Sequence, residues 1–100
     1  MAPAGKGFRL RPKARADLAE IWSYTAEHWS PQQADIYHNG IVEVLAALAV
    51  GRLKGRSVDF IRTGYFKYPA ASHFVFFKLA EYGIDVIRIL HQRMDVAQHL

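Results

Sequence analysis

The period of the apolar side chains changes near Gly64 in this chain of 100 residues. Over residues 12–50, apolar residues recur every three or four positions, which is the spacing of an amphipathic helix. After it, they form short runs rich in valine, isoleucine and phenylalanine, which are typical of β-strands. A chain in which a helical part precedes a strand part favours an α+β fold, with the helices on one face of a sheet.

The helical part is predicted to contain two helices, over residues 12–28 and 31–50. Ser30 and Gln33 have the spacing of a capping box, and the proline after Ser30 takes the first helical position, where its missing N–H costs nothing. Because so short a turn joins the helices, we expect an antiparallel hairpin. Gly40 lies inside the second helix, where glycine costs about 1 kcal/mol relative to alanine, so we expect the two helices to pack closely there.

The strand part and the N-terminus supply four predicted strands. They cover residues 8–11, 65–68, 73–80 and 84–91, and residues 51–63 are expected to be a basic loop. The order β-α-α-β-β-β predicts an α+β fold of two layers, an antiparallel sheet with an α-helical hairpin packed on one face. Residues 1–7 are expected to be a flexible N-terminal lead, and residues 8–100 a single domain.

Both faces of the predicted sheet are apolar. One set has no charged member and is assigned to the face beneath the helices: Val75, Phe77, Leu79, Ile87 and Ile89. The other set mixes aromatic, aliphatic and cationic side chains: Tyr65, Lys67, Phe74, Phe76, Lys78, Val86, Arg88 and Leu90. Because a two-helix hairpin covers only one face, we expect the second face to be exposed and to bind a partner. The alternative is that the basic loop and the C-terminal tail fold over it.

The composition excludes several classes of protein. A hydrophobic share of 51% permits a core and excludes a disordered chain. The absence of cysteine excludes a disulfide scaffold and thiolate metal sites, and it fits the reducing cytoplasm. No segment approaches the roughly 20 apolar residues of a membrane span, and no metal-binding or phosphate-binding motif is present, so we expect no membrane, metal or cofactor. The net charge of +4 permits either a nucleic acid or an acidic protein as partner.

Ribonuclease chemistry is one alternative that the C-terminal residues raise. A ribonuclease that uses the 2′-hydroxyl group needs a base, an acid and cations around the phosphate. His91 and His99 could supply the base and the acid, and the cations could be Arg93, Lys67 and Arg88. A cationic strand end is more often a solvated surface, and chain ends are usually poorly ordered, so our main interpretation contains no catalytic residue.

Three segments of the sequence have a specific form. Residues 10–24 include the run IWSY, and residues 29–34 read WSPQQA. The most specific segment, residues 86–95, contains R-x-L-H-x-R-M-D, and a His-Leu pair ends the chain. With these segments, residues 8–100 resemble the ParE-type toxins (plasmid stabilisation proteins) of bacterial toxin–antitoxin systems. The resemblance implies the fold of the RelE/ParE superfamily.

The resemblance also implies a function and partners. A ParE-type toxin inhibits DNA gyrase by protein binding, without catalysis or specific nucleic-acid binding. A cognate ParD-type antitoxin neutralises it in a heterotetramer or larger complex. The alternatives are a ribosome-dependent mRNA endonuclease of the RelE type and an inactive homologue that only binds antitoxin. RelE-type toxins tend to carry a catalytic arginine where this chain has Pro69-Ala70-Ala71-Ser72, which favours the ParE branch.

The sequence departs from the ParE pattern at two places. Arg11 stands where a capping threonine is usual, which weakens the start of the first helix by up to about 1 kcal/mol. Ala71-Ser72 stands where a Gly-Arg pair is common in the hairpin between two strands. If that arginine contributes to toxicity in relatives, its absence lowers the potency expected of this chain.

The candidate site residues form three sets. The antitoxin is expected to contact exposed apolar positions of the helical hairpin and the second sheet face: Trp22, Ile36, Tyr65, Lys67, Phe74, Phe76, Lys78 and Arg88. Target binding and toxicity are expected of C-terminal residues that add little to the core: Arg93, Met94, Asp95, His99 and Leu100. The catalytic residues of the RelE-type alternative are His91, Arg93, His99 and Lys67.

Overall fold

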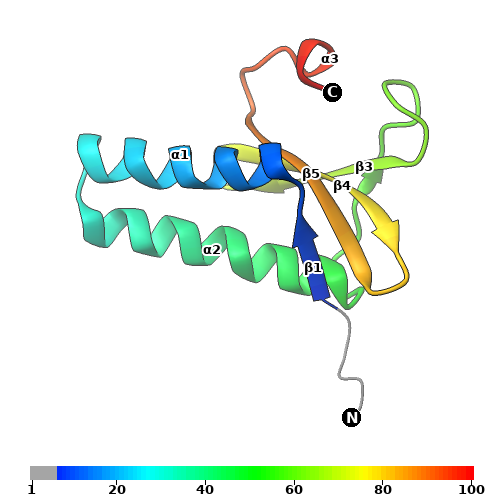
Figure 1. Cartoon of the computed structure of the whole chain (residues 1–100), viewed down its shortest axis with the longest axis horizontal. Coiled ribbons are helices and arrows are strands. Elements are labelled where there is room, and N and C mark those ends of the chain that lie inside the picture. Colours follow the sequence, from blue (N-terminus) through cyan, green and yellow to red (C-terminus); the bar gives the residue numbers. More distant parts are fainter. Residues whose placement is uncertain (1–6) are drawn as a thin grey trace.

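The sheet has five strands in the order β1-β5-β4-β3-β2, and a helical hairpin covers one of its faces (Figure 1). A computed structural model describes residues 7–100 of the chain. The elements are β1 (Gly7–Leu10), α1 (Pro12–His28), α2 (Pro31–Ala49), β2 (Arg56–Ser57), β3 (Tyr65–Ala70), β4 (His73–Ala80), β5 (Gly83–His91) and α3 (Val96–His99). The predicted two-layer α+β architecture is confirmed. No helix within residues 7–100 has the length and apolar character needed to cross a membrane.

The helical hairpin begins and ends where its sequence predicts, to within one residue. The Ser30 hydroxyl accepts a hydrogen bond from the Gln33 N–H at 3.0 Å, so the predicted cap of α2 is formed. Arg11 precedes α1 without a side-chain cap, because a guanidinium has no acceptor atom. The prediction for Gly40 is wrong: no neighbouring atom lies within 4 Å of the place that its Cβ would take, so close packing does not explain this glycine.

The sheet is mixed and not wholly antiparallel as expected. β1 lies parallel to β5, with Gly7 opposite Gly83, whereas the other strand pairs are antiparallel. Gly83 has a φ of 133°, and a Cβ at this position would overlap the Gly7 carbonyl oxygen, so only glycine fits this close approach. Gly7, which we expected in the flexible lead, begins β1. The rest of that predicted lead, residues 1–6, lies outside the described residues.

The segment expected to be a basic loop, residues 51–63, contains the two-residue strand β2. Its residues Arg56 and Ser57 pair with Lys67 and Phe66 of β3. β3 also continues two residues beyond its predicted end, to Ala70. The sheet therefore has one more strand than expected, and that strand forms its edge next to β3.

A β-bulge in β5 changes which side chains face the helices. Phe76 pairs with Arg88, but Phe77 pairs with Val86, so Ile87 is an extra residue between the two pairs. One extra residue reverses the alternation of faces along a strand. Val86 consequently lies in the core beneath the helices, whereas Ile87 does not, which corrects the faces predicted for both.

The core beneath the helices is otherwise close to its prediction. The sheet contributes buried side chains that include Val75, Phe77 and Ile89. The helices contribute buried side chains that include Ala14, Leu18, Ile41 and Leu45. Leu79, which we assigned to this core, is exposed, because β3 pairs with β4 only as far as Lys78 and leaves Leu79 without a neighbouring strand on that side.

The centre of the second face is covered by the loop and the C-terminal tail, as the alternative expected, so the expectation of an open apolar surface is wrong. Lys67 and Lys78 on the same face stay partly exposed. Val58, Phe76 and Leu90 are buried on this face. Side chains from the loop before β3, from the strands and from the C-terminal tail pack against them: Ile61, Tyr65, Phe74, Val96 and Leu100. Phe76 is 0% exposed and cannot be an antitoxin contact at the surface. The loop and the tail close over this face because its large apolar side chains gain free energy when water is excluded.

Candidate functional site

A groove of about 780 Å³ lies between the turn end of the helical hairpin and the end of the sheet where β3 turns into β4. α1 and α2 supply one wall. The turn between β3 and β4, the last residues of β5 and the segment after β5 supply the other. The groove therefore joins segments from both halves of the chain.

The rim of the groove is apolar and open to solvent. Tyr24, Trp29 and Met94 line it, and they are 60%, 76% and 40% exposed. These are three of the seven large hydrophobic side chains that are exposed in residues 7–100. Tyr24 also stacks on His28, with ring centroids 3.9 Å apart. Clustered aromatic and methionine side chains that face water mark a surface for a protein partner.

The floor of the groove is a polar cluster built on Tyr37. Its hydroxyl accepts a hydrogen bond from the Ser72 N–H at 3.0 Å and lies 2.8 Å from His73 Nδ1. Since the Tyr37 oxygen accepts from Ser72, its proton is available for Nδ1 of a neutral His73. His73 lies opposite His91 in the β4–β5 register, with ring centroids 5.2 Å apart. His91 Nδ1 in turn accepts the Arg93 N–H at 3.1 Å.

The surroundings of His73 favour its neutral form. Burial lowers the pKa of His73 below its ordinary value, and the nearby His91 lowers it further, while Asp17 acts in the opposite direction. Two neighbouring imidazoles have the chemistry to transfer protons, as a ribonuclease requires. However, two carboxylates, Asp17 and Glu20, also line the groove. The only lysine or arginine among the lining residues, Arg88, is already paired with Asp17. This charge distribution disfavours a polyanionic RNA at the groove.

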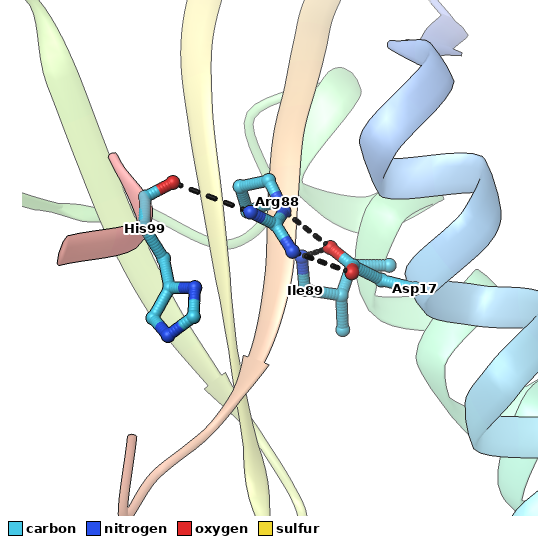
Figure 2. A network of polar contacts seen from close by, with 4 residues as sticks. All are labelled: Asp17, Arg88, Ile89 and His99. Atoms are coloured by element: carbon cyan, nitrogen blue, oxygen red, sulfur yellow. Dashed lines mark hydrogen bonds and ion pairs between the residues drawn. The ribbon is translucent and has the colours of Figure 1, made fainter. Parts of the chain in front are cut away.

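The Asp17–Arg88 pair connects the helical layer to the sheet. Arg88 Nε and Nη2 donate to the two carboxylate oxygens of Asp17 at 2.7 and 2.8 Å, and one of those oxygens also accepts the Ile89 N–H at 3.0 Å. Figure 2 shows the guanidinium between this carboxylate and the main-chain oxygen of His99, to which Nη1 donates at 3.3 Å. The hydrogen bonds to Asp17 raise the pKa of the Arg88 guanidinium above its ordinary value. Arg88 thus ties α1, β5 and the C-terminal helix together.

The residues predicted to bind antitoxin fall on two separate surfaces. Ile36 is exposed on α2, and Trp22 of α1 is half-buried, with its Nε1 donating to Asp35 Oδ1 at 2.8 Å. The members on the sheet lie on the face away from the hairpin. Lys67 Nζ is there 4.4 Å from the Phe74 ring centroid, and Lys78 Nζ is 5.8 Å from that of Tyr65. Arg88 is engaged with Asp17, and Phe76 is buried.

The C-terminal residues predicted to bind a target have two kinds of environment. Arg93, Met94 and Asp95 are exposed, and Met94 lines the groove. Leu100 packs against the second-face cluster, and the His99 carbonyl accepts from Arg88. The expectation that these residues add little to the core therefore agrees with the exposure of Arg93, Met94 and Asp95, but it is wrong for Leu100.

The catalytic set of the RelE-type alternative is not assembled. His91 lies in the groove on the hairpin side of the sheet, next to His73. Lys67 lies over Phe74, which belongs to the cluster on the opposite face. The sheet therefore separates a proposed base from a proposed phosphate ligand. No group of three or more metal-ligating side chains forms within residues 7–100.

The groove is not predictable from the local sequence pattern. Asp17 and Tyr37 bond to partners that lie 71 and 36 positions away along the chain. One signal was available. Predicted strands of equal length, 73–80 and 84–91, joined by a tight turn, place their far ends opposite each other, and these ends are His73 and His91.

Comparison with known protein families gives a match over nearly the whole described chain. Residues 8–96 match the model of the ParE toxin of the type II toxin–antitoxin system parDE. The chain is 42% identical over 94 residues to toxin ParE1 of Mycobacterium tuberculosis. The aligned residues cover 93% of this chain and 96% of that protein. It is 33% identical over 95 residues to toxin ParE1 of Caulobacter vibrioides, covering 95% and 98%.

Solved structures share the fold. A chain of the chromosomal ParDE toxin–antitoxin system from P. aeruginosa superposes with a TM-score of 0.71 at 22% identity, covering 86% of this chain and 95% of that one. A chain of the toxin–antitoxin complex RelBE2 from Mycobacterium tuberculosis gives a TM-score of 0.58 at 16% identity, covering 89% and 100%. At these identities the likeness concerns the fold alone.

Proposed function

Because the chain belongs to the ParE family of toxins of type II toxin–antitoxin systems, we propose that it inhibits DNA gyrase by binding and that a ParD-type antitoxin neutralises it. The gyrase target follows from the family. The observation that supports a protein-binding mode of action is the groove, with its exposed aromatic rim and its polar floor. Such a surface is built to hold another polypeptide.

The antitoxin is proposed to occupy the groove and the adjoining hairpin. Tyr24, Trp29 and Met94 would be the apolar anchors, and Trp22 and Ile36 would extend the contact along the helices. Full burial of a large apolar side chain contributes about 1.5–3 kcal/mol, so a few such anchors supply a large share of the binding free energy. The sheet residues that we first assigned to the antitoxin lie on the other face and are left out of this surface.

The proposed inhibition requires no catalytic step. The residues that RelE-type cleavage would need lie on opposite faces of the sheet, and acidic side chains line the groove that holds the two histidines. In this proposal the toxin encounters both gyrase and the antitoxin in the cytoplasm. A dimeric antitoxin would give a heterotetramer or a larger assembly, which light scattering of the co-purified complex measures.

The test compares two activities of one preparation of the purified chain. Gyrase supercoiling is measured with and without the cognate antitoxin, and ribosome-dependent mRNA cleavage is measured in parallel. We expect the chain to inhibit supercoiling, the antitoxin to restore it, and the mRNA to remain intact. Cleavage of mRNA without gyrase inhibition would support the RelE-type alternative. Antitoxin binding without either activity would identify an inactive homologue.

A further inference from the structure

Charged residues are segregated along this chain. Residues 16–51 contain acidic residues and no lysine or arginine: Asp17, Glu20, Glu27, Asp35 and Glu43. Residues 52–78 contain six basic residues and, apart from Asp59, no acidic one: Arg52, Lys54, Arg56, Arg62, Lys67 and Lys78. The first segment forms most of the helical hairpin, and the second forms β2, β3 and most of β4. The molecule therefore has an acidic helical part and a basic sheet part.

Four of these basic residues gather on the sheet face away from the helical hairpin. We call Arg56, Arg62, Lys67 and Lys78 the basic face. Arg56 lies opposite Lys67 in the β2–β3 register, so the two side chains share a face. Lys67 Nζ lies 4.4 Å from the Phe74 ring centroid. Around Tyr65, the ring centroid is 5.8 Å from Lys78 Nζ and 5.9 Å from Arg62 Cζ.

The cations of the basic face form no ion pair within the described part of the chain, although Asp85, which pairs with Arg11, lies opposite Lys78 in the β4–β5 register. The two ion pairs in residues 7–100 are Arg11–Asp85 and Arg88–Asp17, and neither involves the basic face. The one acidic residue of the segment, Asp59, accepts the Gly64 N–H through its carboxylate at 2.7 Å. Several cations without an ion-pair partner on one surface attract a polyanion.

We propose that the basic face binds the phosphate backbone of duplex DNA without sequence preference. Duplex DNA carries one negative charge per about 1.7 Å of its axis, which matches a surface of closely spaced cations. Single-stranded nucleic acid is less suited, because it needs open aromatic faces for base stacking, and cations already lie over Tyr65 and Phe74. A protein partner would need an apolar centre, whereas those two rings are half-buried beneath the cations.

This DNA contact is independent of the proposed gyrase and antitoxin binding, because it uses the opposite face of the sheet from the groove. It would allow the toxin to hold DNA and a protein partner at the same time. The supercoiling assay and a direct DNA-binding assay therefore report on the two proposals separately.

The experiment measures fluorescence anisotropy of a labelled mixed-sequence duplex with the full chain over a range of salt concentrations. The logarithm of the affinity should fall linearly with the logarithm of the salt concentration, with a slope of about −0.9 for each phosphate contacted. We expect Arg56→Gln combined with Arg62→Gln to weaken binding about tenfold at low salt and to reduce the slope by roughly 2. The matched control, Lys13→Gln with Arg15→Gln, removes the same charge from exposed positions of α1 and should keep the parent slope.

Four outcomes would overturn the proposal. The first is the absence of salt-dependent binding to the duplex, and the second is an equal loss in both double variants. The third is tighter binding of single-stranded RNA than of duplex DNA. The fourth is displacement of the duplex by polyglutamate at equal charge concentration, which would indicate an acidic protein as partner. Circular dichroism melting of both variants establishes that they are folded.

Discussion

Ala71 adopts a φ of 55°, the only positive φ of a non-glycine residue in residues 7–100. It lies in the turn between β3 and β4, next to Ser72 at the groove. A left-handed conformation costs an L-amino acid about 1–2 kcal/mol, and glycine adopts it freely. The departure from a glycine at this position, noted in the sequence, therefore has a cost in stability.

We expect Ala71→Gly to stabilise the chain by about 0.5–1 kcal/mol, after the larger conformational entropy of unfolded glycine is subtracted. The melting temperature should rise by several degrees, since 1 kcal/mol corresponds to roughly 4–8 °C in a chain of this size. Thermal unfolding followed by circular dichroism measures the change. Ser72→Gly in the same turn is the control and should not raise the melting temperature. A lower melting temperature for Ala71→Gly would contradict the prediction.

The low pKa of His73 predicts a pH dependence of stability. Burial and the neighbouring His91 make protonation harder in the folded chain than in the unfolded chain, whose histidine titrates near 6.5. The unfolded state therefore binds more protons as the pH falls below that value, and the free energy of unfolding decreases. At higher pH both states are neutral, and this effect vanishes.

Urea unfolding at about pH 7.5 and pH 5.5 should give a lower midpoint at the acidic pH. His73→Gln should reduce the difference between the two midpoints, because glutamine does not titrate and its amide can still bond to the Tyr37 hydroxyl. An unchanged difference in this variant would assign the pH dependence to other groups.

The exposed rim of the groove can be tested with Tyr24→Ala combined with Trp29→Ala. Both side chains are mostly exposed in the free chain, so the variant should fold, but it loses two anchors for the antitoxin. We expect antitoxin binding to weaken at least tenfold, since about 1.4 kcal/mol of lost burial is a factor of ten. Titration calorimetry with the cognate antitoxin measures this. Phe60→Ala removes another exposed ring, one that does not line the groove, and should leave the affinity unchanged. Equal losses in both variants would argue against the groove.

Among the elements, the short helix α3 has a structural role out of proportion to its length. Asp95 caps it by accepting the Ala97 N–H at 3.2 Å. Val96 and Leu100 then pack on the cluster around Phe76, and the His99 carbonyl accepts from Arg88. The short helix and Leu100 thus cover, together with the loop before β3, a face that the helical hairpin does not reach.

Deletion of residues 96–100 should destabilise the chain. Full burial of two such side chains is worth about 1.5–3 kcal/mol each, and both are only half-buried, so we expect a loss of about 2–3 kcal/mol. The melting temperature should fall by more than about 8 °C. Gln98→Ala, an exposed change in the same helix, is the control and should leave it unchanged. If the deletion loses toxicity while melting at the parent temperature, the tail serves the target and not the fold.

At the scale of the whole molecule, the sequence predicts those elements whose positions are set by local features, such as helix caps and the period of apolar side chains. The cap at Ser30 and the apolar periods of the chain place both helices and all four predicted strands to within two residues. The bulge at Ile87 and the parallel pairing of β1 are not predictable in this way, because they arise from contacts between distant segments. The cover of the second face was one of two alternatives, and the packing of the loop before β3 and of the C-terminal tail decides between them.

Less of the candidate site than of the fold could be predicted from the sequence. The resemblance and the C-terminal motif directed attention to residues 86–100, and Met94 and His91 do lie in the groove. The other side of the groove comes from the helical hairpin, whose aromatic residues have helical spacing and therefore resemble core positions. Whether such a residue is buried or exposed depends on how far the sheet extends beneath the hairpin. The local sequence pattern does not specify that extent.

The pairing of the first strand with the last has a consequence for synthesis. β1 lies at the edge of the sheet and has β5 as its sole neighbouring strand. Its backbone hydrogen bonds to the sheet can therefore form only after β5 has been synthesised. Chains emerge from the ribosome N-terminus first, and contacts between distant segments form late. A nascent chain can form its helical hairpin early, but β1 cannot pair until residues 83–91 of β5 have been synthesised. The sheet is therefore expected to gain its first strand last, although that strand is made first.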